Sequence, residues 1–318
     1  MATDSVRKLV IIVGPTGVGK TECAYHLAKA LDGEIVSIDS RYLYRGMDIG
    51  TAKPSLQMRE TVRHHLVDVA DPDEDWSLVL FQKKVAEALE EIYNRRKLPI
   101  FVGGTGQYYR AILEGWQPPP VTPNPRLRTI LERWLTELEP QDRNRYLSLL
   151  DPEAAIKIDP RNVRRMVRAF EVIYSSGIPF SRQRKGNPLS YPAFVIGLTL
   201  SREVLYKRCD QRIQRMFEEG WIEEVKSLLD KGYNPDLPSF SAIGYREIAA
   251  YLQGLRTLDE VVVEIKRRTR TLIRRQANWF RADDPRIHWF QVSESVVSEI
   301  LLAVQQWLAH LQAQVEMQ

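Results

Sequence analysis

"GPTGVGKT", Gly14–Thr21, has the glycine, lysine and threonine spacing of a phosphate-binding loop. It follows an apolar run at 7–13, which predicts a buried strand, and it opens the segment KTECAYHLAKAL, whose apolar residues recur at helical spacing. Strand, loop and helix in this order turn main-chain N–H groups and a helix N-terminus toward an anion. The sequence therefore predicts phosphate binding by Gly14, Pro15, Thr16, Gly17, Val18, Gly19, Lys20 and Thr21.

Strands and helices alternate beyond this loop. The segment 33–40 predicts a second buried strand that ends at Asp39 and Ser40, and 98–106 a third that runs into a glycine-rich turn. Between them, 75–97 has the pattern of an amphipathic helix, with Asp75 or Ser77 as its cap. This order is typical of an α/β fold with a parallel sheet, whose active groups lie at the carboxyl ends of the strands.

Five prolines between Pro118 and Pro125 mark a boundary. Helical segments follow at about 126–150 and 160–176, and a strand pattern returns at 191–200. We therefore expect a helical insertion at 120–190 within an α/β core formed by 1–119 and 191–318. The core should be mostly helical over 201–281, with a last strand in RIHWFQV and a closing helix at 294–314.

The composition is that of a globular protein, with 44% hydrophobic and 27% charged residues among 318. No apolar run approaches the roughly 20 residues of a membrane span, so no membrane partner is expected. Two cysteines exclude a disulfide framework and favour a cytoplasmic location. The net charge of +4 says little, but arginine clusters at 161–168 and 266–281 indicate a polyanionic partner, unless they are only solvated helix faces.

Several residues beside the loop can carry chemistry. A strand-end carboxylate such as Asp39 suits a general base or a magnesium partner, although Asp39 or Ser40 could also be a helix cap. Thr105, in the turn GGTG, can donate to a phosphate or a substrate. The loop GMDIGTAKP, with Lys53, is typical of a substrate loop. His64 and His65 should point to opposite faces of a strand and are interpreted as structural. Tyr108 and Tyr109 are either base-stacking or core residues.

Taken in order, these segments resemble the tRNA dimethylallyltransferase family, also called tRNA isopentenyltransferases. The resemblance is carried by GPTGVGKT, DSRYLYRGMDIGTAKP, HHLVDVADP, VGGTGQYYRAILEG, DPRNVRRMVRAFEV, SAIGYREI and RRTRTLIRRQANWFR. It implies a P-loop fold like that of nucleotide kinases, and it implies an enzyme of the bacterial type. Tyr42 departs from the glutamine expected in many members, so a side-chain contact from this position is in question.

The resemblance also implies the reaction. The loop would hold the diphosphate of dimethylallyl diphosphate, and the acceptor would be the exocyclic amine of adenosine 37 in tRNA. Asp39 would accept the amine proton, with Lys20, Thr105 and a Mg²⁺ on Thr21 stabilising the leaving diphosphate. Contacts to tRNA would come from Asp39, Ser40, Arg41, Tyr42, Thr105, Arg128, Arg164, Arg165, Met166, Val167, Arg168, Ser241, Ala242, Ile243, Gly244, Tyr245 and Arg246.

Other interpretations remain open at this point. An adenylate isopentenyltransferase would use the same donor on free AMP or ATP, but would not need a basic insertion. A small-molecule kinase on the same fold would turn over ATP without tRNA. An RNA-binding protein with a vestigial loop would not need Lys20, Thr21 and Asp39 together. Arg212 and Arg215 are expected near a phosphate unless they lie on an exposed helix face, and the protein is expected to be a monomer.

Overall fold

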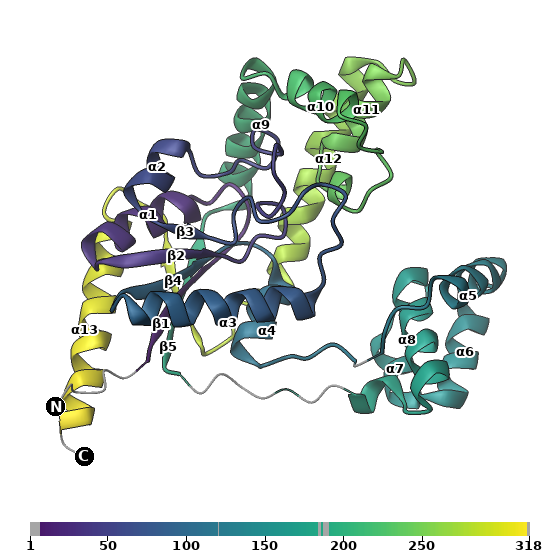
Figure 1. Cartoon of the computed structure of the whole chain (residues 1–318), viewed down its shortest axis with the longest axis horizontal. Coiled ribbons are helices and arrows are strands. Elements are labelled where there is room, and N and C mark those ends of the chain that lie inside the picture. Colours follow the sequence, from purple (N-terminus) through teal and green to yellow (C-terminus); the bar gives the residue numbers. More distant parts are fainter. Residues whose placement is uncertain (1–6, 120, 184–185, 187–190, 317–318) are drawn as a thin grey trace. The chain divides into compact units, whose positions relative to one another are not determined.

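The computed structural model describes residues 7–119, 121–183, 186 and 191–316, which form two compact units (Figure 1). Residues 1–109 with 190–318 make an α/β unit, and 110–189 make a helical unit. The first division falls about ten residues before the predicted one, because Trp116 forms a β-bridge with Gly186 inside the helical unit. The predicted boundary residues 120 and 190 themselves lie outside the described residues.

The α/β unit is built on a six-stranded sheet in the order β3-β2-β4-β1-β5-β6, and every neighbouring pair is parallel. The strands are β1 (Leu9–Val13), β2 (Gly33–Ser37), β3 (His64–His65), β4 (Leu98–Val102), β5 (Ala193–Thr199) and β6 (Ile287–Gln291). Ile11 of β1 is in register with Phe101 of β4 and Val195 of β5. Since parallel strands end at the same edge, the segments after β1, β2 and β4 meet there, which confirms the predicted α/β fold.

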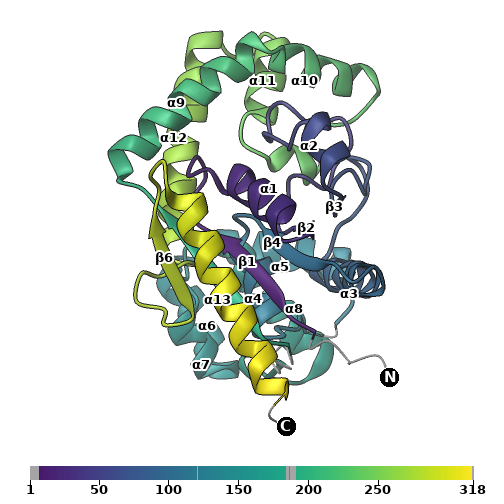
Figure 2. The same cartoon turned by 90° about the vertical axis from the view of Figure 1, so that its left-hand side faces the viewer.

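Helices cover both faces of this sheet (Figure 2). On one face, α1 (Lys20–Ala30) and α13 (Val296–Glu316) pack against Val10 and Ile12 of β1. On the other lies α3 (Leu78–Asn94), capped by the Ser77 side chain as one of the two predicted caps. The alternation of side chains along β1 thus supplies both layers of the core.

The helical stretch predicted at 201–281 is confirmed. It contains α9 (Arg202–Glu218), α10 (Trp221–Asp230), η2 (Ser239–Ser241), α11 (Tyr245–Leu252) and α12 (Leu258–Ala277). Two shorter helices, α2 (Leu56–Thr61) and α4 (Gly106–Leu113), follow loops at the carboxyl edge of the sheet. Figure 1 shows α9 and α12 rising from this edge, where they can wall a site.

The helical unit has a core of its own. Its elements are α5 (Pro125–Glu137), α6 (Pro140–Leu150), α7 (Pro152–Lys157), α8 (Val163–Ser176) and η1 (Phe180–Gln183). Proline begins α5, α6 and α7, where its missing N–H costs no helical hydrogen bond. Leu135, Leu147, Met166 and Phe170 are fully buried together.

Charged groups buried at the edge of the sheet are paired. Glu34 accepts hydrogen bonds from Arg95 and His65. Burial alone would raise the pKa of Glu34, but these hydrogen bonds hold it below its usual value. His64 is tied to the carbonyl of Val62, and burial lowers its pKa. Both histidines are therefore structural, as predicted.

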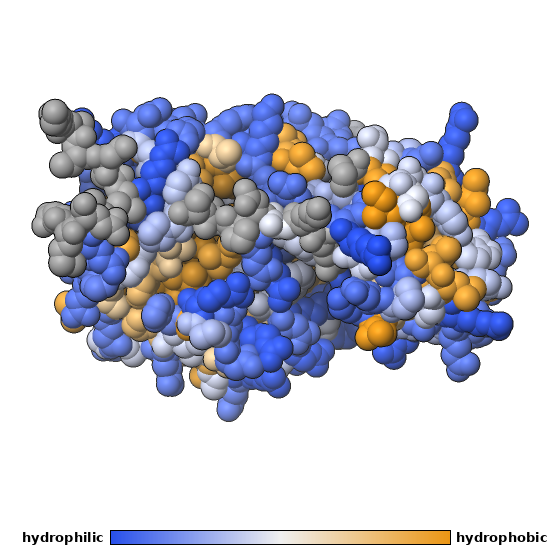
Figure 3. Space-filling view, turned by 90° about the horizontal axis from the view of Figure 1, so that it is seen from below, coloured by the Kyte–Doolittle hydropathy of each residue, from blue (hydrophilic) through white to orange (hydrophobic). Residues whose placement is uncertain are grey.

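The surface seen in Figure 3 is mostly hydrophilic, with separate apolar patches. Leu149 and Ile156 of the helical unit are among the most exposed large apolar side chains, at 75% and 87%. Among the residues that the structure describes, no helix combines the length and apolarity needed to cross a bilayer.

Candidate functional site

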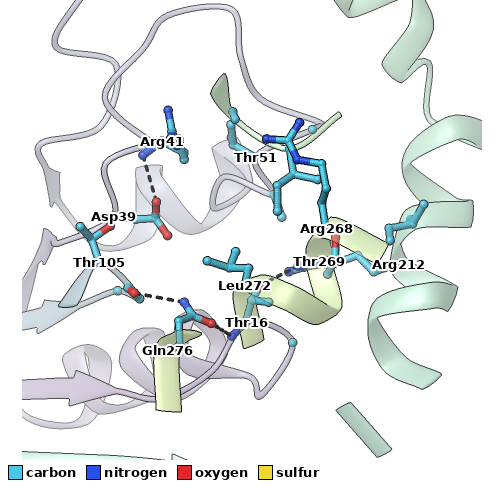
Figure 4. A pocket seen from close by; sticks show the side chains of 18 of the residues that line it. Thr16, Asp39, Arg41, Thr51, Thr105, Arg212, Arg268, Thr269, Leu272 and Gln276 are labelled. Atoms are coloured by element: carbon cyan, nitrogen blue, oxygen red, sulfur yellow. Dashed lines mark hydrogen bonds between the residues drawn. The ribbon is translucent and has the colours of Figure 1, made fainter. Parts of the chain in front are cut away.

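A cavity of about 1460 Å³ opens at the carboxyl edge of the sheet (Figure 4). Its floor comes from the loops after β1, β2 and β4, and its walls come from α9, α12 and the segment 241–243. These pieces are far apart in the sequence, and the parallel sheet and its helices bring them together. The cavity is therefore the place to look for the predicted site residues.

The phosphate-binding loop presents part of itself to this cavity. Thr16, Gly17, Gly19, Lys20 and Thr21 line it, whereas Gly14 and Val18 are buried beneath. Helix α1 begins at Lys20, so its free N–H groups and positive dipole end lie beside the cavity. This geometry suits an anion, and phosphate binding by the loop stays a prediction.

Lys20 is the cation of the loop. Its ammonium donates to the carbonyl oxygen of Pro15 at 2.8 Å. The pKa of Lys20 is lowered to about 8, because loss of hydration outweighs the attraction of Asp39, and the charge of Arg212 acts in the same direction as the loss of hydration. A bound phosphate would restore the missing counter-charge and hold the proton on Lys20.

Asp39 follows β2 and lines the cavity from the side opposite α12 (Figure 4). Its Oδ1 accepts the backbone N–H of Arg41 at 2.9 Å, which fixes the carboxylate in a turn. Thr105 Oγ1 accepts the backbone N–H of Ser40 at 3.1 Å, so the turn after β4 supports the turn after β2. Oδ2 of Asp39 has no hydrogen-bond partner in the described part of the chain and can accept a proton from a substrate.

Two of the three glycines of the GGTG turn, Gly104 and Gly106, make room for side chains of α12 and of the residues that follow it. A Cβ atom on Gly104 would lie 2.3 Å from the Gln276 amide nitrogen, and one on Gly106 would lie 2.1 Å from the Trp279 ring. Gln276 uses this space to donate to the carbonyl of Gly104 at 3.1 Å. Its oxygen accepts the backbone N–H of Thr16 at 2.8 Å. Gln276 therefore ties the phosphate-binding loop to the turn after β4.

Arginines dominate the charge of the cavity. Arg212 donates to the hydroxyl of Thr16 at 2.8 Å, so α9 brings a guanidinium to the phosphate-binding loop as expected. Arg215 lies in the same wall. The cationic lining residues are Lys20, Arg41, Arg208, Arg212, Arg215, Arg267, Arg268 and Arg275, against the acidic Glu22, Asp39 and Glu264. Such a surface favours a polyanionic ligand.

The loop after Gly46 lines the cavity through Gly50, Thr51 and Ala52, but its lysine does not. Lys53 is instead buried in ion pairs with Asp48 and Asp68. The carboxylate of Glu224 accepts the backbone N–H groups of residues 48–50 and fixes the loop from outside.

Tyr42 is a wall residue. Its hydroxyl donates to the carbonyl of Ala52 at 2.8 Å, which leaves the ring rather than the hydroxyl to face a ligand. Burial raises the pKa of this phenol to about 12, so it remains protonated. Tyr108 and Tyr109 are buried, which makes the core interpretation correct for both.

The segment 241–246 divides between the cavity and the core. Ser241, Ala242 and Ile243 line the cavity. Gly244 packs on the ring of Trp221, and Tyr245 is fully buried with its hydroxyl donated to Glu224. The exposed Arg246 donates to backbone carbonyls of 235–237. The last three residues therefore support the segment and do not face the cavity.

The residues of the helical unit that were predicted to contact tRNA also fall into two groups, exposed and buried. Arg164 and Arg165 are exposed, and their guanidinium groups have no partner within the described residues. Met166 and Val167 are buried in the core of that unit, so their side chains cannot meet RNA.

Arg128 and Arg168 differ from this exposed pair. Both guanidinium groups bind the fully buried carboxylate of Glu171, at 2.9 and 2.6 Å. Burial alone would raise the pKa of Glu171, but hydrogen bonds from Arg168, the Asn124 backbone and Arg128 lower it. Arg128 and Arg168 therefore stabilise the helical unit, which was not expected from the sequence.

Several lining residues were not singled out from the sequence, among them Thr51, Leu272 and Gln276. Gln276 lies in the segment RRQANWFR, which was singled out, but nothing in its spacing marks it as a partner of the distant Thr16. Gly104 and Gly106 of the GGTG turn were the available signal, because each leaves space for a side chain of that segment.

The cavity can hold a divalent cation only with help from a ligand. Among the described residues, no group of three or more His, Cys, Asp or Glu side chains converges on one point. The Thr21 hydroxyl and the Asp39 carboxylate line the cavity and are oxygen donors of the kind that Mg²⁺ accepts. They suit an ion that is held mainly by phosphate oxygens and water.

The sequence is similar to those of known proteins over most of its length. The model of the IPP transferase family matches residues 42–283. A tRNA dimethylallyltransferase of Roseiflexus castenholzii is 51% identical over 273 residues, which are 86% of this chain and 89% of that protein. One of Thermomicrobium roseum is 45% identical over 288 residues, 91% of this chain and 87% of that protein.

Solved structures agree with the sequence relatives. The full-length tRNA isopentenylpyrophosphate transferase of Bacillus halodurans superposes with a TM-score of 0.73 at 39% identity, covering 98% of this chain and all of that one. A eukaryotic dimethylallyltransferase, described as acting on tRNA, gives a TM-score of 0.79 at 26% identity, over 94% of this chain and 79% of that one.

The pKa of Lys20 predicts how anion binding depends on pH. A bound diphosphate raises this pKa above 8, so binding is strongest below pH 8 and weakens as the pH rises through it. We expect the dissociation constant for inorganic diphosphate, measured by calorimetry without metal, to rise about tenfold between pH 7 and 9. In Lys20→Met only the ionisation of the ligand remains, so equal pH profiles for the two proteins would contradict this role.

Proposed function

The chain belongs to the IPP transferase family, and from this premise we propose that it transfers a dimethylallyl group from dimethylallyl diphosphate to tRNA. The acceptor is the exocyclic N6 amine of adenosine 37, and the products are N6-isopentenyladenosine and diphosphate. One observation carries the proposal: the phosphate-binding loop and Asp39 face the same arginine-lined cavity from different sides.

The diphosphate end of the donor belongs at the loop. Lys20, the N-terminus of α1 and Arg212 converge there. As the carbon–oxygen bond breaks, negative charge grows on the diphosphate, and fixed donors at this point stabilise it. Mg²⁺, which we propose to be held by Thr21 and the diphosphate oxygens, would supply further positive charge to the leaving group.

The amine end belongs at Asp39. The adenine amine is a weak nucleophile because its lone pair is delocalised into the ring. As it bonds to the allylic carbon it becomes acidic, and Oδ2 of Asp39 is available to take the proton. Thr105 contributes by holding the Asp39–Ser40 turn through the backbone of Ser40.

Transfer RNA is the acceptor that best fits the surroundings. The lining arginines suit a phosphate backbone, and the cavity has room for a base turned out of a loop. We propose that the helical unit contacts the anticodon arm through Arg164 and Arg165, which have free guanidinium groups. We further propose that the protein works as a monomer in the cytoplasm.

The reaction is tested on purified protein with Mg²⁺, dimethylallyl diphosphate and unmodified tRNA that has adenosine 3′ of its anticodon. After digestion, mass spectrometry should find isopentenyladenosine in the tRNA, and none on AMP offered in parallel. Product on AMP alone would assign the protein to the free-nucleotide transferases. ATP turnover without any prenyl product would indicate a kinase.

Replacing Asp39 tests the general base. Asp39→Asn keeps the acceptor oxygen of the turn but cannot take a proton, so we expect transfer to fall by 10²- to 10⁴-fold. Affinity for tRNA should stay within a few-fold, as measured by filter binding. Asp73→Asn makes the same change at an exposed carboxylate outside the cavity and is the matched control. A loss of tRNA binding or of folding in Asp39→Asn would instead make this carboxylate structural.

Replacing Arg165 tests the contact of the helical unit with RNA. Each phosphate contact contributes nearly one unit to the slope of log affinity against log salt, so Arg165→Ala should flatten this slope by about one. The matched control is Arg133→Ala, which removes the same charge from an arginine of that unit already paired with Glu137. The proposal fails if both variants keep the wild-type slope.

A further inference from the structure

Leu272 is an unusual residue in the cavity wall. It lies on α12 among polar neighbours, with Arg268 and Thr269 one turn before it and Arg275 and Gln276 one turn after it. Leu272 is 37% exposed, whereas Ile265, Ile213 and Met216, which line the same cavity from α9 and α12, are nearly fully buried. Ligand pockets usually combine apolar lining with a few placed polar groups, so an apolar side chain open to this charged cavity suits a ligand that is itself partly apolar.

The position of Leu272 is also specific. Figure 4 shows its side chain projecting from α12 into the cavity, between the Thr16–Arg212 pair and Asp39. Under the proposed function, the diphosphate occupies the first of these places and the adenine amine the second. The five-carbon group must lie between them, because its first carbon exchanges the diphosphate oxygen for the amine nitrogen.

We propose that Leu272 is the contact of the dimethylallyl group and limits the length of the prenyl chain that the enzyme accepts. This inference rests on the proposed function and adds a specificity-determining residue to it. The branched side chain covers the methyl groups of the donor and fills the space into which a longer chain would extend. Gln276, one turn away and bound at both ends, holds this part of α12 in place.

In this arrangement Leu272 also protects the reacting carbon of the donor from water. In transfer, the N6–carbon bond forms, the carbon–oxygen bond breaks with its electron pair going to diphosphate, and Asp39 takes the amine proton. Water can replace the amine, and the products are then dimethylallyl alcohol, diphosphate and a proton. An apolar cover over the carbon that becomes cation-like keeps water from it until the amine arrives.

Binding to the resting enzyme is the first test, because it does not depend on turnover. Two probes are compared by calorimetry with the full-length protein: inorganic diphosphate, and a non-hydrolysable thiodiphosphate analogue of the donor. Leu272→Ala should weaken the analogue about tenfold and leave diphosphate within twofold. Val263→Ala, on the exposed side of the same helix and outside the cavity, should change neither. Equal weakening of both probes, or of neither, would overturn the proposal.

Chain-length selection is the second test. Leu272→Ala should raise kcat/KM for geranyl diphosphate relative to dimethylallyl diphosphate by tenfold or more, and should increase the yield of dimethylallyl alcohol per modified tRNA. Leu272→Phe should lose the dimethylallyl donor while it retains diphosphate binding, so a folding defect in one variant cannot hide the result. A wild-type protein that makes no isopentenyladenosine would refute the proposed function, whereas normal wild-type transfer with unchanged donor preference in Leu272→Ala would refute only this inference.

Discussion

A single side-chain amide joins the two loops on which the site is built. Gln276 accepts the N–H of Thr16 and donates to the carbonyl of Gly104, across 260 and 172 residues of sequence. Backbone groups at the carboxyl edge of a sheet need partners, and here α12 supplies them to both loops at once. The same helix then presents Leu272 and several arginines to the space between the loops. The shape of the cavity depends on this one connection.

Rigidity around the cavity comes from groups that never reach it. Glu224 holds the loop before Thr51 through three backbone N–H groups, and Lys53 is enclosed by carboxylates on the other side of that loop. In the helical unit, the buried carboxylate of Glu171 binds the guanidinium groups of Arg128 and Arg168. Charged residues that a sequence suggests as substrate contacts thus hold the backbone in place instead. A buried charge is stable only when it is paired.

The positive groups and the reactive carboxylate of the site lie in different places and serve different parts of the reaction. Positive groups gather at the phosphate-binding loop and along α9 and α12, and one carboxylate, Asp39, faces them with an oxygen left free. This suits a transfer in which an anion leaves at one end and a proton is taken up at the other. Between the two, Leu272 provides a place for a short apolar group.

The sequence by itself determined the parallel α/β fold, the helical insertion, the phosphate-binding loop and the position of Asp39, because local periodicity and glycine spacing record strands, helices and turns. It could not decide which arginines are free. Arg165 and Arg168 are three residues apart on one helix, yet one is exposed and the other is bound to Glu171. It also gave no sign that Gln276 binds the phosphate-binding loop or that Leu272 lines the same cavity as Asp39. These residues are distant in the chain, and only the packing of α12 against the edge of the sheet brings them together.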